Sequence, residues 1–148
     1  MGLDMYLHAK RYLWSFSDES EDKTIANEVQ KLAKIPEDFE VKEIVIKAGY
    51  WRKANQIHRW FVENVQDGVD NCGDYYVERN QLQELLDLCK IVRADHSQAE
   101  ELLPSASGFF FGNTDYDEWY YNDIENTISV LEDALEDKNG EYYYTSSW

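Results

Sequence analysis

The sequence predicts a single α+β domain, residues 1–148, with about four helices packed on a small mixed or antiparallel sheet. Apolar and polar residues alternate over residues 3–10, as they do in a half-buried strand. In later segments, apolar residues recur every three or four positions, as they do in amphipathic helices. No glycine-rich phosphate loop follows the first strand, which disfavours a doubly wound parallel sheet. A chain of 148 residues also has the size of one ordinary domain.

Four segments are expected to form strands. Residues 3–10 show the clearest alternation, and we expect this strand to be an inner one. Residues 39–47 include an uninterrupted apolar run at 44–46, which predicts burial on both faces of the sheet. Residues 75–77 form a short candidate strand, and residues 141–148 are expected to form the last strand, at a sheet edge.

Four segments are expected to form helices. The first covers residues 23–34 and ends before Pro36, because the residue preceding a proline avoids helical backbone angles. The second covers residues 49–65, the third follows Asn80 as its N-cap, and the fourth covers about residues 116–137. The apolar stripes expected for the last two helices are Leu82, Leu85, Leu86, Cys89 and Val92, and Tyr120, Ile124, Ile128, Leu131 and Leu135.

The segment 49–65, GYWRKANQIHRWFVENV, combines aromatic, cationic and amide side chains in a helical pattern. Gly49 is expected at a turn between strand and helix. The simplest interpretation is a half-buried helix whose cations and amides face water. Alternatively, the start of this helix holds an anion or a polar ligand, because a helix N-terminus favours negative charge. The residues expected to bind such a ligand are Trp51, Arg52, Lys53, Asn55, His58, Trp60 and Phe110.

The formal net charge of −16 argues against direct nucleic-acid binding, which needs a surplus of Lys and Arg. The charge is also uneven, since residues 97–148 carry 12 acids and only one cation, Lys138. Such a surface could dock on a basic surface of another protein, although acidity can also serve solubility alone. The residues expected to contact such a partner are Asp115, Asp117, Glu118, Asp123, Glu125, Glu132, Asp133 and Glu136.

No common motif for catalysis or phosphate binding is present. Cys72 and His58 are the one cysteine–histidine combination worth considering, but nothing in their spacing brings them together. A glycosidase-type carboxylate pair at residues 115–118 is a second option. The simpler account of those acids is a first helical turn that complements the helix dipole. We therefore expect a non-enzymatic protein, and no reaction can be assigned.

No metal, cofactor or membrane contact is expected. The loop 66–74 has two glycines and three acids, but their order does not match a calcium-binding loop. No apolar run approaches the roughly 20 residues that span a bilayer. The N-terminal residues lack the apolar segment of a secretory signal, which predicts a cytoplasmic protein.

Three stretches together resemble a family of small uncharacterised proteins from bacteriophage and prophage genomes. They are MGLDMYL, GYWRKANQIHRWFVENVQDGVDNCG and SGFFFGNTDYDEWYYNDI. The resemblance covers most of the chain and is weakest at residues 15–43 and at the C-terminal tail. It implies an accessory phage product that works inside a bacterial cell, where such proteins often bind and disable a host component. It provides no catalytic residues.

Two functions are compatible with these observations. The first is binding and inhibition of a host protein, one involved in defence or in nucleic-acid binding, through an acidic surface, with mimicry of a nucleic acid as one option. The alternative is sequestration of a nucleotide or another small anionic signal by the helix at residues 50–62 and the segment Phe109–Phe111. The three phenylalanines cannot all point to one side, so we expect one of them to be covered by another layer or to line a pocket.

Overall fold

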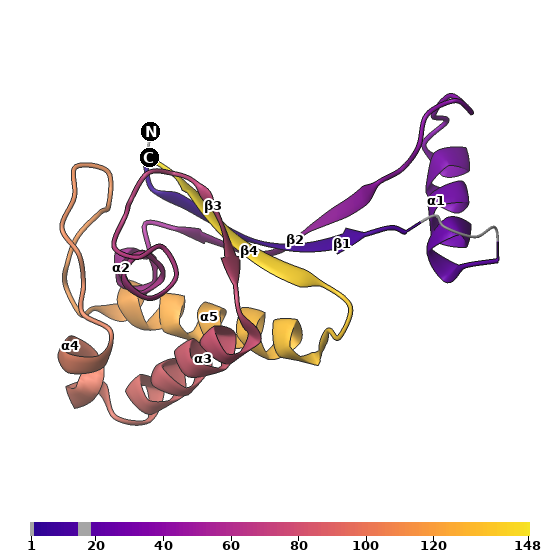
Figure 1. Cartoon of the computed structure of the whole chain (residues 1–148). Helices are drawn as coiled ribbons and strands as arrows, with labels where there is room; N and C mark the ends of the chain where they lie inside the picture. Colours follow the sequence, from indigo (N-terminus) through magenta and orange to yellow (C-terminus); the bar gives the residue numbers. More distant parts are fainter. Residues whose placement is uncertain (1, 15–18) are drawn as a thin grey trace. The chain divides into compact units, whose positions relative to one another are not determined.

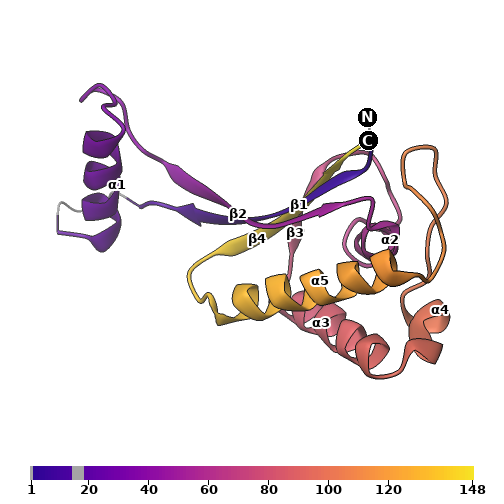
Figure 2. The same cartoon turned by 180° about the vertical axis from the view of Figure 1, so that it is seen from behind.

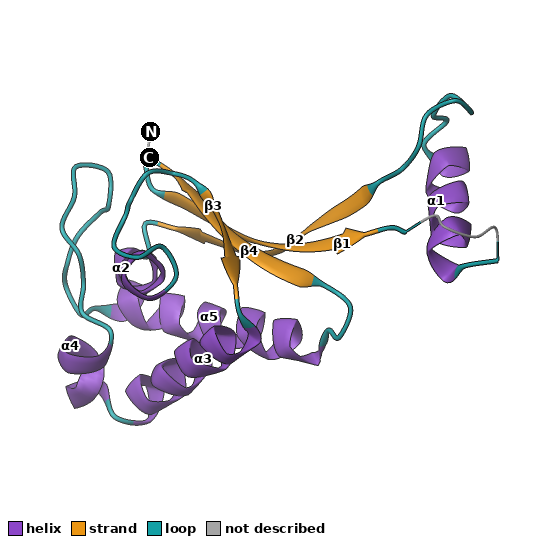
Figure 3. Cartoon of the chain, viewed as in Figure 1, coloured by secondary structure: helices purple, strands orange, loops and turns teal. Residues whose placement is uncertain are grey.

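The computed structural model describes residues 2–14 and 19–148 and confirms the α+β fold class. Five α-helices and four strands are present in these ranges, so the expected number of about four helices is close (Figure 3). In chain order the elements are β1 (Asp4–Tyr12), α1 (Glu21–Leu32), β2 (Glu43–Arg52), α2 (Asn55–Asn64), β3 (Asp74–Val77), α3 (Arg79–Ala94), the 3₁₀ turn η1 (His96–Gln98), α4 (Ala99–Leu102), α5 (Glu118–Glu136) and β4 (Glu141–Ser147).

The four strands form an antiparallel sheet in the order β2-β1-β4-β3. The prediction that the first strand is an inner one is confirmed. The prediction that the last strand lies at an edge is wrong, because β3 pairs with its outer side, with Tyr75 opposite Tyr144 and Val77 opposite Tyr142. The short segment 74–77 thus covers β4 and becomes the edge strand itself.

Contacts between residues divide the chain into two compact units, residues 1–9 with 47–148 and residues 10–46. The single-domain organisation stays a prediction. In the smaller unit, α1 begins at Ser20, whose hydroxyl accepts a hydrogen bond from the Lys23 backbone N–H at 3.1 Å. The expected burial of residues 44–46 on both faces is wrong, since Val45 and Ile46 are 52% and 56% exposed. The reason is that residues 44–46 are not part of the core cluster, whose members on β2 are Ala48 and Trp51.

The core of the larger unit lies between the sheet and the helices α2, α3 and α5, which pack on the same face of the sheet (Figures 1 and 2). The alternation of β1 is confirmed, because Leu3, Met5 and Leu7 are fully buried. The α3 stripe is buried as expected, and so is the α5 stripe apart from the partly buried Leu135. α3 begins one residue before the expected cap Asn80, with a capping box between Glu78 and Gln81.

The second helix begins six residues later than expected, because β2 continues through Arg52. A tight turn then connects β2 to α2. Lys53 adopts a left-handed conformation with φ of 59°, and Ala54 has φ of −75° and ψ of 69°, the angles of an inverse γ-turn. The Asn55 N–H donates to the Lys53 carbonyl at 2.8 Å and closes this turn. As a result, Trp51 lies on the strand, where it is buried and its indole N–H donates to Thr127 Oγ1 at 2.8 Å.

Gly49 lies inside β2 rather than at a turn, and Val130 of α5 packs closely against it. A Cβ atom at Gly49 would lie 2.6 Å from Val130 Cγ1. We expect Gly49→Ala to lower the free energy of unfolding by about 1–3 kcal/mol through this overlap, as measured by urea denaturation. The double variant with Val130→Ala should recover part of the loss. Additive effects of the two substitutions would show that the overlap is not the cause.

Candidate functional site

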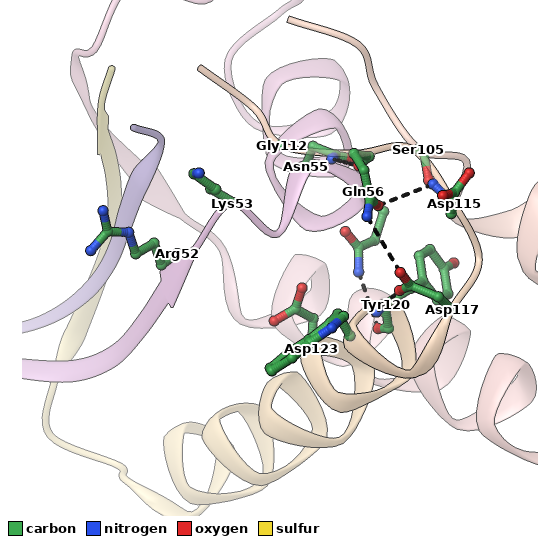
Figure 4. Close-up of a pocket in the computed structure, with 12 residues that line it drawn as sticks. Arg52, Lys53, Asn55, Gln56, Ser105, Gly112, Asp115, Asp117, Tyr120 and Asp123 are labelled. Atoms are coloured by element: carbon green, nitrogen blue, oxygen red, sulfur yellow. Dashed lines mark hydrogen bonds between the residues drawn. The ribbon is translucent and has the colours of Figure 1, made fainter. Parts of the chain in front are cut away.

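A cavity of about 340 Å³ opens in the larger unit (Figure 4). Three pieces of chain form it: residues 52–56, from the end of β2 to the start of α2, the loop 103–117 that connects α4 to α5, and the first two turns of α5. Its lining residues include Arg52 and Lys53 from the turn, Asn55 and Gln56 from α2, and Asp123 from α5. The cavity therefore has cationic, amide and acidic side chains around one opening.

Asn55 holds the loop 103–117 against α2 through three hydrogen bonds. Its amide nitrogen Nδ2 donates to the carbonyls of Phe111 and Asn113 at 3.0 and 2.8 Å, and its Oδ1 accepts from the Ala106 N–H at 3.0 Å. The expectation that Asn55 and Gln56 face water is wrong, because both side chains are buried. They are amides that satisfy buried polar groups, and all hydrogen-bonding atoms of the Asn55 side chain have partners.

Gly112 lets the same loop pass close to the β2–α2 turn. Its φ of +83° lies in the left-handed region, which glycine adopts without a steric cost. A Cβ atom at this position would also lie 3.3 Å from Lys53 Cβ. Both constraints therefore favour glycine where the loop meets the turn.

The acidic side of the cavity consists of Asp115, Asp117 and Asp123. Asp117 is the N-cap of α5, and its carboxylate accepts from the Tyr120 N–H at 3.1 Å and from the Asn113 side chain at 3.4 Å. Asp115 is exposed. Burial raises the pKa of Asp123 to about 6, the nearby Asp117 charge acts in the same direction, and a hydrogen bond from Gln56 opposes the shift. The Asp123 carboxylate is thus the most desolvated of the three.

Trp119 is 75% exposed and also lines the cavity. It precedes Asp123 by four residues on α5, a spacing that places two side chains next to each other on a helix surface. Sequence reasoning did not select Trp119 as a site residue. The available signal was that an aromatic residue falls outside the apolar stripe of an otherwise regular amphipathic helix.

Arg52 and Lys53 are exposed, and neither forms an ion pair with any described residue. In Figure 4 they lie on one side of the view, and Asp115 and Asp117 lie on the other. The two cations follow each other directly at the end of β2, and the positive φ of Lys53 directs the chain into α2. The opposite charges are therefore kept apart around the opening.

Four of the seven residues predicted to bind a ligand do not line this cavity. Trp51 and Trp60 are buried in the core, and Phe110 lies in the loop, where its carbonyl accepts from the Leu3 N–H at 3.0 Å. His58 is 1% exposed and belongs to a separate hydrogen-bonded chain. Arg52, Lys53 and Asn55 are the three that the structure brings together.

The His58 ring is fixed between two partners. Nδ1 lies 2.7 Å from the Tyr144 hydroxyl, and Nε2 lies 2.9 Å from Asp70 Oδ2. Asp70 also accepts from the Trp148 indole N–H at 3.0 Å, so this chain connects α2 with the loop 66–73 and the C-terminal end of the protein. Both ring nitrogens are therefore occupied by groups other than Cys72, which is exposed.

The acids predicted to contact a partner occupy different environments. Besides the three cavity aspartates, Glu125 and Glu132 pair with Arg93 and Lys90 of α3 at 3.6 and 2.9 Å. The Lys90 hydrogen bond lowers the pKa of Glu132. Exposed members of the set without an ion pair among the described residues are Glu118, Asp133 and Glu136.

The three phenylalanines of the loop separate as expected, but the one that faces away is neither covered nor part of the cavity lining. Phe111 packs edge-on against His58 with ring centroids 5.1 Å apart, and Phe110 is half-buried. Phe109 is 96% exposed, so the expectation that it would be covered or line a pocket is wrong. The reason is that residues 109–111 form a turn and not a strand under another layer.

The three sequence stretches on which the predicted resemblance depends, within residues 1–7, 49–73 and 107–124, come together beside this cavity. The Lys53 N–H donates to the Leu3 carbonyl at 2.8 Å, and the Leu3 N–H donates to the Phe110 carbonyl. The Asn55 side chain connects the second stretch to the third by donating hydrogen bonds to the Phe111 and Asn113 carbonyls. Segments separated by about fifty residues each are thus joined by backbone and side-chain hydrogen bonds at one place.

No protein-family model matches the sequence, and neither the curated proteins nor the solved structures provide a match. Within residues 2–14 and 19–148, no helix is long and apolar enough to cross a membrane. In the same ranges, no group of three His, Cys, Asp or Glu side chains is arranged to hold a metal ion.

Replacement of Asn55 by alanine should release the loop 103–117. The substitution removes three hydrogen bonds and leaves buried backbone groups without partners, so we expect a loss of about 2–4 kcal/mol in unfolding free energy. Amide hydrogen exchange should accelerate most at Ala106, whose N–H loses its acceptor. Asn122→Ala, at an exposed position of α5, is the matched control. Equal effects of the two variants on stability and exchange would contradict the assigned role of Asn55.

Proposed function

We propose that this protein binds and sequesters a small polar ligand of the nucleotide class in the cavity lined by Arg52, Lys53 and Asp123. One observation supports the proposal above all others. Two unpaired cations, a desolvated carboxylate and an exposed indole line the same cavity of about 340 Å³. Ligand pockets for small molecules commonly have volumes of about 300–1,000 Å³ and a few convergent polar groups.

The cations are the groups that fit phosphate. Arg52 and Lys53 are exposed and have no ion pair among the described residues, so their charges are available to a ligand. A guanidinium next to an ammonium binds phosphate oxygens through charge-assisted hydrogen bonds. Such a ligand would give these two side chains the counter-charge that the protein does not supply.

The other side of the cavity fits the base of a nucleotide. The Trp119 indole offers a flat apolar face for stacking, and each stacked base contributes about 1–3 kcal/mol in proteins that use this contact. Asp123 and Asp117 offer carboxylate acceptors for N–H groups. Asn55 and Gln56 form the rigid polar wall between these parts, since their amides bond to backbone carbonyls. This arrangement of cations, indole and carboxylates suits the binding of a nucleotide. The family resemblance suggests that the protein would do so inside a phage-infected bacterium.

Removal of both cations should abolish the affinity for phosphate-bearing ligands. We expect nucleoside mono- and diphosphates to raise the melting temperature of the native protein, and the Arg52→Ala, Lys53→Ala variant to lose at least about tenfold in affinity by calorimetry. Lys31→Ala with Lys138→Ala changes the net charge equally at exposed positions and is the control. If no nucleotide changes the melting temperature of the native protein, the proposal is wrong.

A second candidate function is docking on a basic surface of a host protein, favoured by the charge of the helical layer. Residues 78–137, from the start of α3 to the end of α5, contain fifteen Asp or Glu and three Lys or Arg. Eight of these acids and all three cations lie on α3 or α5, and these two helices pack against each other. Two of the eight predicted partner-binding acids are already paired with α3 cations, which leaves a smaller free acidic surface than the sequence indicates.

This second function predicts a partner whose binding depends on salt and on α5. The variant with Glu118→Gln, Asp133→Asn and Glu136→Gln should lose a protein captured from bacterial lysate at about 0.05 M salt, and about 0.5 M salt should release it from the native protein. The control carries Glu28→Gln, Glu37→Gln and Asp38→Asn in the smaller unit. Capture that is unaffected by salt and by the α5 substitutions would exclude docking through this layer.

A further inference from the structure

Asp123 is the carboxylate of the cavity that combines partial burial with no role as a helix cap. An ionised carboxylate offers about four lone-pair positions. Asp117 uses both of its oxygens for the Tyr120 N–H and the Asn113 side chain, and Asp115 is exposed to water. Asp123 is half-buried, and the Gln56 side chain, whose Nε2 donates to the Tyr120 carbonyl at 3.3 Å, is the neighbouring donor that lowers the Asp123 pKa. A desolvated carboxylate with open acceptor positions in a cavity favours a ligand that brings N–H donors.

The position of Trp119 restricts the shape of that donor. Residues four apart on a helix present neighbouring side chains, with Cβ atoms about 5–6 Å apart. A flat ring stacked on the Trp119 indole would therefore reach Asp123 with its edge. The donors must lie side by side in the plane of the ring, because a carboxylate accepts two parallel N–H groups in a bidentate pair.

Among the common bases, guanine has this edge. Its ring N1–H and its 2-amino group lie next to each other and both donate. Adenine and cytosine place a single amino group beside a ring nitrogen acceptor, and uracil places its N–H between two carbonyl oxygens. An acceptor on the ligand that faces a carboxylate is repelled, so these edges leave Asp123 poorly satisfied.

We infer that the cavity selects guanine nucleotides, with the guanine edge bound by the Asp123 carboxylate, the ring stacked on Trp119 and the phosphates held by Arg52 and Lys53. This inference rests on the proposed function, because it names the base within the same ligand class. It assigns Asp123 as the residue that determines base specificity, whereas the two cations determine that a phosphate is bound.

The base preference can be measured with four nucleoside monophosphates. Calorimetry with native protein at about pH 7.5 should give GMP an affinity at least about tenfold higher than that of IMP, which lacks the 2-amino group. The affinities of AMP and UMP should be lower than that of IMP. Affinity for GMP should fall as the pH decreases through about 6, where Asp123 takes up a proton and loses acceptor capacity. Gln56 and Asp117 act on the Asp123 pKa and Asp115 lines the same cavity, whereas the cavity cations Arg52 and Lys53 do not contribute to the shift.

The Asp123→Asn substitution should change which base the cavity prefers, and not only weaken the binding of guanine. The asparagine side chain presents one acceptor and one donor, which match the N1–H and the adjacent 2-carbonyl of xanthine. The variant should therefore bind XMP more tightly than GMP, the reverse of the native order.

The variant should also fold well, because a neutral asparagine avoids the cost of burying a charged carboxylate. In the native protein this cost is fully present above the folded pKa of about 6 and absent below the unfolded value near 3.8. We expect a higher melting temperature than native at about pH 7.5, with the gain absent at about pH 4.

The outcomes separate the two proposals. If all four monophosphates bind equally and the affinity depends on Arg52 and Lys53, the guanine inference is wrong and the nucleotide-binding function stands. Equal binding of GMP and XMP to the Asp123→Asn variant also contradicts the inference. If none of the nucleotides binds the native protein, both the inference and the proposed function are wrong.

Discussion

The candidate site depends on the three hydrogen bonds of the Asn55 side chain. The loop 103–117 contains no regular secondary structure beyond turns, so its backbone groups need partners from elsewhere. Asn55 supplies them from α2, at Phe111, Asn113 and Ala106. The β2–α2 turn places Asn55 at the start of the helix, where its side chain can reach the loop. We call these three hydrogen bonds the Asn55 clamp. Because they involve both carbonyl and N–H groups of the loop, the clamp fixes the orientation of the loop as well as its distance from α2.

This clamp also explains how opposite charges can remain unpaired around one cavity. Arg52 and Lys53 are attached to the end of a strand, and Asp117 and Asp123 are attached to a helix that packs on the sheet. Neither element can move toward the other without breaking core contacts, for example at Gly49 and Val130. Burial of Asp123 without a cation raises its pKa and therefore lowers the stability of the folded protein near neutral pH. Stability sacrificed at one place in an otherwise consistent fold is typical of functional sites.

The sequence was most informative where apolar residues repeat regularly, and least informative at the site. The stripes of α3 and α5 and the alternation of β1 could be predicted because burial on one face imposes a period. The segment 49–65 misled because tyrosine and tryptophan suit both a helix face and a strand, and only pairing with β1 decides that residues 49–52 are extended. The buried amides Asn55 and Gln56 could not be predicted, since their partners lie about fifty residues or more away in the sequence. The exposure of Trp119 could have been predicted, because this aromatic residue lies outside the apolar stripe of α5.

The strong negative charge of the protein does not conflict with an anionic ligand. At physiological ionic strength the Debye length is about 8 Å, so acids farther than this from a phosphate at the β2–α2 turn are largely screened. The charges nearest to the ligand then dominate the binding energy, and around the cavity those are Arg52 and Lys53 on one side and Asp115, Asp117 and Asp123 on the other. The more distant acids still slow the approach of any polyanion, including nucleic acids. The same charge distribution that disfavours a nucleic acid therefore leaves a mononucleotide as an acceptable ligand, because its phosphates need only the local cations.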